Sequence, residues 1–172
     1  MAKQKRDISS RFGSDRGFIL TVPANYDHDH FLDTFIKQVS GKETVYVFDE
    51  RMNDKYFHDP SHHLYPGRRY SVEMIPVLGM TSTETCVEFL QKEGCLFVGA
   101  HGLVLLYMME SRRIGRGRHV VALDHPEHLA RVDQGTPLVP VLSNDKQIFL
   151  FDLIRADASW TPVHDLLCFR EV

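Results

Sequence analysis

The order of strand, amphipathic helix, glycine and strand occurs twice in this chain, and it limits the possible folds more than any other feature. The first copy comprises 17–22, 29–40, Gly41 and 44–48, and the second comprises 70–77, 82–93, Gly94 and 95–98. This order resembles the split β-α-β arrangement, in which two helices cover one face of an antiparallel sheet. We therefore expect both helices to pack on the same face of one sheet.

The two helices are indicated by their caps and by the spacing of their apolar residues. In the first copy, Asp27 or Asp29 can accept hydrogen bonds from free N–H groups of the first turn. In the second copy, Thr81 and Glu84 match a capping box, in which a hydroxyl and a carboxylate each bind a backbone N–H group. The apolar residues at helical spacing are Phe31, Leu32, Phe35, Ile36 and Val39 in the first helix and Cys86, Val87, Phe89 and Leu90 in the second.

The second half of the chain is predicted to be rich in strands. Seven consecutive apolar residues at 103–109 show no period, and their short length favours a doubly buried strand over a helix. This strand would pair with 119–123 through the arginine-rich loop between them. The remaining predicted elements are a short helix at 124–132, a hairpin of 138–142 and 147–154 around the polar turn 143–146, and a last strand at 166–169. The expected fold class is α+β, with a mixed, mostly antiparallel sheet and two main helices.

Between the two copies, residues 49–69 form a polar stretch that contains prolines and has no periodicity. An irregular segment of this length is uncommon inside a compact domain and is often functional or mobile. We therefore expect the loop at 49–69 to be functional or mobile.

The composition is typical of one globular domain. The 172 residues are 43% hydrophobic and 25% charged. Residues 1–16 carry five basic and two acidic groups and few large apolar residues, so we expect a mobile tail ahead of a single domain at 17–172. The net charge of −3 excludes a protein coated in basic surface. Any phosphate or nucleic-acid binding must therefore come from a local patch.

The cysteines point to a reducing compartment. Cys86, Cys95 and Cys168 each lie in an apolar stretch, where a free cysteine behaves as a small hydrophobic residue. We expect all three to be buried and reduced, as in cytoplasmic proteins. The basic N-terminus is not followed by the apolar segment of a signal peptide, and no apolar run approaches the roughly 18 residues of a membrane span. We therefore expect a soluble cytoplasmic protein that does not act in a membrane.

An arginine- and glycine-rich loop is the best candidate for a binding site. Arginine forks match phosphate oxygens, and glycine-flanked amides can form an anion-binding nest. The candidate residues are Arg112, Arg113, Gly115, Arg116, Gly117 and Arg118. The alternative is a solvated hairpin tip whose charges discourage edge-to-edge aggregation.

The same loop resembles the acetyl-CoA loop of the GNAT acetyltransferases. That family's pattern is Arg or Gln, two residues, Gly, one residue, then Gly or Ala, and Arg112, Gly115 and Gly117 match it. The resemblance implies an apolar strand before the loop and a long helix after it, whose N-terminus would hold the pyrophosphate. In this chain, residues 119–123 instead favour a strand.

Histidines are clustered in two places. Imidazole and carboxylate side chains together are typical ligands of zinc or iron. The possible metal ligands are His28, His30, His58, His62 and His63, with Asp27, Asp29 and Asp59 beside them. Neither cluster has a recognised metal-site spacing, and the alternative is a set of exposed loop histidines. His101 lies apart, between two glycines, where a satisfied core or turn residue is expected more often than a general base.

No catalytic signature accompanies these residues, because the chain has no Gly-x-Ser-x-Gly elbow and no phosphate loop. We therefore interpret the chain as a non-enzymatic cytoplasmic binding or interaction protein. Its ligand would be anionic or a protein partner, and no cofactor is assigned. The alternatives are a metal-dependent hydrolase, a divergent GNAT-like acetyltransferase, and a single-stranded nucleic-acid binder that uses the tail, the arginine loop and loop tyrosines.

Overall fold

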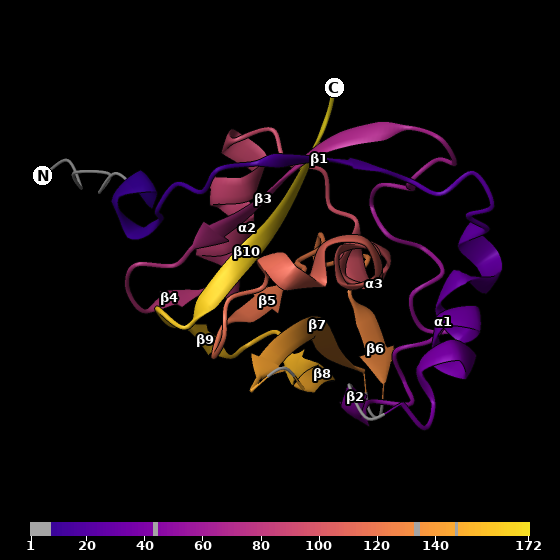
Figure 1. Cartoon of the computed structure of the whole chain (residues 1–172). Helices are drawn as coiled ribbons and strands as arrows, with labels where there is room; N and C mark the ends of the chain where they lie inside the picture. Colours follow the sequence, from indigo (N-terminus) through magenta and orange to yellow (C-terminus); the bar gives the residue numbers. More distant parts are fainter. Residues whose placement is uncertain (1–7, 43–44, 133–134, 147) are drawn as a thin grey trace, which may run out of the picture.

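The computed structural model describes residues 8–42, 45–132, 135–146 and 148–172. Within these residues the chain has the predicted α+β class, with three α-helices and a mixed, mostly antiparallel sheet (Figure 1). The helices are α1 (Phe31–Val39), α2 (Thr83–Lys92) and α3 (Gly99–Glu110). The strands of the sheet are β1 (Phe18–Thr21), β2 (Val45–Phe48), β3 (Arg69–Pro76), β5 (His119–Val121), β6 (Ala130–Val132), β7 (Thr136–Asp145), β8 (Ile148–Arg155) and β10 (His164–Glu171). A separate pair is formed by β4 (Thr81–Ser82) and β9 (Ser159–Trp160), and three 3-10 helices are η1 (Ile8–Arg11), η2 (His28–His30) and η3 (Ser111–Arg113).

The strands of the sheet do not follow the order of the sequence. Their spatial order is β1, β3, β10, β5, β7, β8 and β2, and β6 pairs with β7. The pairs β10–β5 and β2–β8 are parallel, and the other pairs are antiparallel. Strands β1 and β2 flank α1 in the sequence, yet they lie at opposite ends of this order. The first β-α-β unit therefore spans the whole sheet instead of forming a local strand pair.

Helices α1 and α2 lie on opposite faces of the sheet, so the prediction that both pack on the same face is wrong. Successive residues of β10 point to opposite faces. Leu167 and Phe169 belong to the core that contains α1 and α3, whereas Leu166 and Cys168 belong to the core that contains α2. We call these the α1/α3 face and the α2 face (Figure 1). The local pattern identified each helix, but it did not determine which face each helix covers.

The apolar run at 103–109 is part of helix α3 and not the predicted strand. Leu103, Leu105 and Leu106 are fully buried, because α3 contacts α1 on one side and strands β7 and β10 on the other. A helix that is apolar all round is typical of a buried position, and over seven residues it cannot be distinguished from a doubly buried strand. Gly102 allows the close approach of α3 to the sheet, since an added Cβ would lie 2.1 Å from Val98 and 3.3 Å from Phe169.

Two smaller predictions are also wrong. Residues 95–98 form no strand but a single bridge, in which Leu96 pairs with Phe169. The predicted helix at 124–132 is a turn at 126–128 followed by strand β6, whose residues pair with β7. In both segments, contact with a neighbouring strand determines the backbone, which local propensity does not anticipate.

The helix caps match the prediction in part, since Asp27 is a cap as predicted and Thr81 is not. Ser82, not Thr81, caps α2 by accepting a hydrogen bond from the Thr85 N–H group (3.4 Å). Asp27 caps the short η2 helix, and the first N–H groups of α1 bind Asp54 from the long loop. The predicted hairpin is confirmed, since β7 and β8 pair antiparallel. The predicted turn at 143–146 is too long, because β7 continues through Asp145, and Lys146 has a positive φ of 53°.

Part of the segment expected to be a tail packs on the domain. The ring of Phe12 stacks on that of Phe89 in α2, with 3.9 Å between their centroids. The Gly13 N–H group donates to the Pro76 carbonyl (2.8 Å). The mobile tail stays a prediction for residues 1–7, which lie outside the described residues.

Two of the three cysteines form a disulfide, so the prediction of three reduced thiols is wrong. Cys95 and Cys168 are bonded on the α2 face, with their Cα atoms 5.2 Å apart. Cys86 is free and buried, and burial raises the pKa of its thiol to about 12. The cytoplasmic location was inferred in part from reduced cysteines, and the disulfide removes that part of the argument. Among the described residues, no helix is long and apolar enough to cross a membrane.

Candidate functional site

The arginine loop connects helix α3 to strand β5. It comprises η3 and the turn that follows it. The Gly117 N–H group donates to the Asn144 carbonyl (2.7 Å), and the Asn144 side chain donates to the Ile114 carbonyl (2.7 Å). The loop is therefore fixed to the end of β7, and the Gly117 amide is not available to a nest for an anion. Gly117 has a φ of 70°, which favours glycine at this position.

Two of the four arginines are occupied by contacts within the protein. Arg118 donates to the Asp165 carboxylate and to the carbonyls of Pro162 and His164. The hydrogen bonds to Asp165 raise the pKa of Arg118 above its usual value. Arg113 donates to Glu110 (2.9 Å), and its guanidinium lies 4.4 Å from the centroid of the Phe18 ring. These two arginines stabilise the loop.

The other two arginines line a hollow in the surface. The hollow measures about 400 Å³ and is lined by Ser111, Arg112, Ile114, Arg116, Asn144 and Phe149. Arg112 lies 3.5 Å from Glu110, but 83% of its side chain is exposed, and Arg113 binds the same carboxylate more closely. Arg116 is exposed and has no ion-pair partner in the part of the chain that the structure describes. Two guanidinium groups are therefore available at one site.

The loop does not have the setting that the acetyltransferase resemblance implies. A helix precedes the loop and a strand follows it, whereas the resemblance requires a strand first and a helix second. Strand β5 follows Gly117 at the position where the resemblance requires a helix N-terminus to hold the pyrophosphate. The match of Arg112, Gly115 and Gly117 to the pattern is therefore a match of sequence only.

The histidine clusters come together in part. The rings of His63, His28 and His101 form a stack, with centroids 4.0 Å apart for the first pair and 4.1 Å for the second. His30 and His58 are exposed and lie outside this stack. The ring of His62 faces the edge of Tyr70, 6.3 Å away between centroids.

The stacked arrangement does not resemble a metal site. The His28 Nε2 atom contacts the His58 carbonyl (2.9 Å), and its Nδ1 atom contacts the Tyr26 hydroxyl (3.1 Å). Both nitrogens of this imidazole thus have partners in the protein. Within residues 8–42, 45–132, 135–146 and 148–172, no group of three His, Cys, Asp or Glu side chains could hold a metal ion.

The innermost histidine belongs to a buried polar network that sequence reasoning missed. The Tyr26 hydroxyl lies 2.6 Å from the His101 Nδ1 atom. The Asp54 carboxylate lies 3.7 Å from the His101 Nε2 atom, which is too far for a hydrogen bond, and this buried nitrogen has no hydrogen-bond partner among the described residues. Asp54 also accepts hydrogen bonds from the N–H groups of Leu32 (3.1 Å) and Asp33 (2.9 Å) at the start of α1. The network thus joins α1, α3 and the long loop. The only signal in the sequence was a histidine among apolar residues.

Burial determines the protonation of this network. Burial and the neighbouring His28 and His63 lower the pKa of His101 to about 3, so its ring is neutral at pH 7. Burial also raises the pKa values of Tyr26 and Asp54 above their usual values. Only 1% of His101 is exposed, so its ring does not form part of the protein surface. We therefore assign this network to the stability of the fold.

The long loop is packed on the domain along much of its length. Met52, Phe57 and Leu64 are buried in the core of the α1/α3 face. The Ser61 hydroxyl donates to the buried Asp124 carboxylate, which also accepts from the Ser61 and His125 N–H groups. The loop thus packs on the α1/α3 face and places Asp54 near His101.

The chain matches no protein-family model, no curated protein and no solved structure. Its function is therefore argued from the chemistry of its surfaces.

Proposed function

We propose that this protein binds a small ligand that carries a phosphate group, in the hollow beside the arginine loop. The observation that carries the proposal is that Arg112 and Arg116 line one hollow of about 400 Å³, while Arg113 and Arg118 are occupied elsewhere. Two cations that line one hollow attract an anion more strongly than either does alone. Phosphate oxygens match the planar forks of arginine, and the Ser111 hydroxyl at the rim can donate a further hydrogen bond.

The rest of the hollow suits a flat or apolar group attached to the phosphate. Phe149 and Ile114 provide apolar surface next to the arginines. The ring of Phe149 is supported by Tyr107, with 5.0 Å between centroids, so its position is fixed. A nucleotide has this combination of a charged group and a ring that can stack. In this proposal Arg112 and Arg116 contact the ligand, and Arg113, Gly115, Gly117 and Arg118 hold the loop in shape.

The proposal can be tested by calorimetric titration with adenosine monophosphate, adenosine and an eight-nucleotide single-stranded RNA. We expect the monophosphate to bind and adenosine to bind much more weakly, with an affinity that falls as salt is added. The double variant Arg112→Ser/Arg116→Ser should lose about tenfold or more in affinity, since hydrogen bonds to charged groups contribute about 1.5–3 kcal/mol each. Arg68→Ser is the matched control, because Arg68 is exposed and does not line the hollow.

The outcomes separate the possible sources of the phosphate. Binding of the RNA far more tightly than the monophosphate would favour single-stranded nucleic acid as the partner. Equal affinities of the wild type and the double variant at low salt would reject the site and return the loop to a solvated surface.

A further inference from the structure

The hydrogen bonds of the stacked histidines determine where their protons lie. The His28 Nε2 atom lies 2.9 Å from the His58 carbonyl, which can only accept, so this nitrogen carries a proton. A neutral imidazole has one such proton, and the His28 Nδ1 atom is therefore an acceptor. The Tyr26 hydroxyl lies 3.1 Å from that atom and donates to it. The single proton of Tyr26 is thus used at His28.

The same hydroxyl determines the tautomer of His101. Its oxygen lies 2.6 Å from the His101 Nδ1 atom, and it has no second proton to donate. His101 therefore carries its proton on Nδ1 and donates it to Tyr26, which leaves the Nε2 atom as a lone pair. Because a lone pair and a carboxylate oxygen are both acceptors, the Asp54 carboxylate stays 3.7 Å from Nε2.

A proton added to His28 reverses this chain of hydrogen bonds. The charged imidazole donates from both nitrogens, and both of its partners, the His58 carbonyl and the Tyr26 oxygen, can accept. Counted along the chain, the Tyr26 proton moves to His28 Nδ1, and the His101 Nδ1 proton moves to Tyr26. The incoming proton then rests on His101 Nε2, facing Asp54. The added charge appears on His28, and His101 is neutral before and after.

The surroundings of the stack allow one positive charge on it. Burial and the neighbouring His28 lower the pKa of His63, and burial lowers the pKa of His101 to about 3, so both rings stay neutral in mild acid. Tyr70 stays neutral as well, because burial raises its pKa. The other titratable groups that act on the stack, on Tyr26 or on Asp54 are Asp27, Asp29, Asp33, Asp59 and His62. Four of these five are carboxylates, which favour a positive charge nearby.

We propose that this chain is a pH-sensitive switch, in which protonation of His28 changes the tautomer of the buried His101 and joins it to Asp54. A hydrogen bond from His101 Nε2 requires the gap of 3.7 Å to close to about 2.9 Å. Asp54 belongs to the long loop and binds the first N–H groups of α1, at Leu32 and Asp33. The switch therefore draws the loop toward α3 and shifts its attachment to α1. Histidine suits this role, since its charge changes between about pH 5 and pH 8.

The test follows the ring nitrogens of His28 and His101 by ¹⁵N NMR between about pH 8 and pH 5. We expect His101 to be protonated on Nδ1 at the upper end and on Nε2 at the lower end. The midpoint of this change should equal that of the His28 titration. The amide proton shifts of Leu32 and Asp33 should change with the same midpoint, because both groups bind Asp54.

Two variants interrupt the chain at different points. Tyr26→Phe removes the hydroxyl, so His28 should still titrate while the tautomer of His101 no longer follows it. His28→Gln removes the titrating ring and should abolish the change at His101 even if Tyr26→Phe does not fold. Tyr65→Phe and His30→Gln are the matched controls, because both residues are exposed and lie outside the chain. Both controls should switch as the wild type does.

Three results would overturn the proposal. In the first, His101 keeps one tautomer while His28 titrates. In the second, the change at His101 persists in folded Tyr26→Phe, and in the third, His101 itself becomes charged within this range. The variant Arg112→Ser/Arg116→Ser should switch as the wild type does, which separates this proposal from the phosphate site.

Discussion

The two faces of the sheet are closed in different ways. On the α1/α3 face, three segments meet at a buried polar network of Tyr26, His101 and Asp54. On the α2 face, a disulfide between Cys95 and Cys168 lies inside the apolar core. The α1/α3 face is stable only while its buried imidazole is neutral. The α2 face is stabilised only while its disulfide is intact. The comparison therefore predicts that acid weakens one face and reductant weakens the other.

The largest effects should come from the apolar cores, where the two faces can be compared directly. Phe169 is fully buried on the α1/α3 face, and Phe89 is 6% exposed on the α2 face. Replacing either residue by Ala should cost about 3–5 kcal/mol of unfolding free energy, because a cavity is left behind. We expect Phe169→Ala to lie at the upper end, since its neighbours α3 and β3 cannot collapse into the space. Urea unfolding of both variants measures this difference, and a cost below about 1 kcal/mol for either would contradict its core position.

The disulfide should contribute nearly as much to the α2 face. Cys95 and Cys168 are 73 residues apart, and closing a loop of that length stabilises the folded state by about 4 kcal/mol in the chain-entropy account. Cys95→Ala/Cys168→Ala should therefore unfold at a lower urea concentration, and added reductant should shift the wild type but not the variant. Thiol titration of the denatured protein should find one thiol without reductant and three with it. Three thiols without reductant would show that the bond is not formed.

Acid should act on the α1/α3 face. The pKa of His101 falls from 6.5 to about 3 on folding, so between these values the folded state binds fewer protons than the unfolded chain. The unfolding free energy should therefore drop as the pH falls, by about 2 kcal/mol between pH 7.5 and pH 5. The lowered pKa of His63 acts in the same direction, and the raised pKa of Asp54 opposes it at lower pH.

The pH prediction is checked by urea unfolding of the wild type and His101→Gln across this range. The unfolding free energy of His101→Gln should change less with pH than that of the wild type, whatever the stability of the variant at neutral pH. His30→Gln is the control, because His30 is exposed and lies outside the stack. An equal loss of stability in the wild type and His101→Gln would remove His101 as the cause.

The smallest losses of unfolding free energy should come from substitutions at the helix caps. Ser82→Ala removes the side-chain cap of α2 and should cost about 1 kcal/mol. Asp27→Ala should cost less, because Asp27 caps only the short η2 helix and Asp54 binds the first N–H groups of α1. Thermal unfolding of the two variants measures the contrast. A larger loss for Asp27→Ala would show that η2 contributes more to the α1/α3 face than Asp54 does.

The sequence predicted the elements that are determined locally. Helices α1 and α2 have one apolar face each and a chain reversal at a glycine, and β3, β7, β8 and β10 have strong β-formers. The sequence could not predict α3, because a helix buried on all sides has no apolar stripe. It also could not predict that β1 and β2 lie at opposite ends of the sheet, since that order depends on contacts between distant segments.

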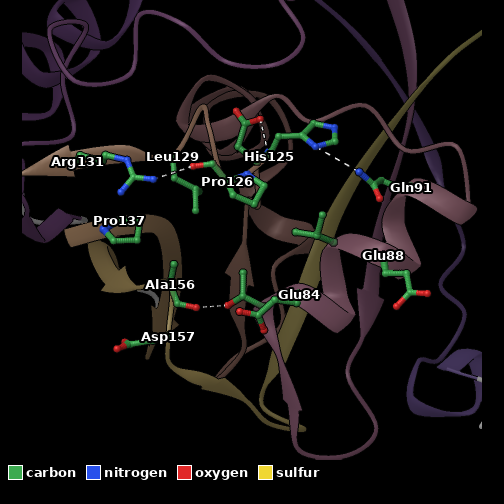
Figure 2. A pocket seen from close by; sticks show the side chains of 13 residues that line it. Glu84, Glu88, Gln91, His125, Pro126, Leu129, Arg131, Pro137, Ala156 and Asp157 are labelled. Carbon is green, nitrogen blue, oxygen red and sulfur yellow. Dashed lines mark hydrogen bonds between the residues drawn. The ribbon is translucent and has the colours of Figure 1, made fainter. Parts of the chain in front are cut away.

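The candidate site was predicted only in outline. The sequence located the arginine loop, but it could not show that Arg118 pairs with Asp165, which lies 47 residues away. It grouped His28 with His63, but it gave no sign that the His28 ring stacks between His63 and His101 of α3. The hollow of about 420 Å³ between α2 and residues 124–131 (Figure 2) had no sequence pattern, because its two walls come together only in the folded protein.

The position of β10 has a consequence for how the chain reaches its fold during synthesis. This strand lies between β3 and β5, so residues 164–171 are needed to join the two halves of the sheet. Until these residues have left the exit tunnel of the ribosome, α2 and α3 have no completed sheet to pack on, and apolar side chains stay exposed to water. A nascent chain in this state is prone to aggregate. We expect ribosome-bound chains stalled before residue 164 to resist folding and to bind chaperones, and chains with β10 outside the exit tunnel to fold and release them.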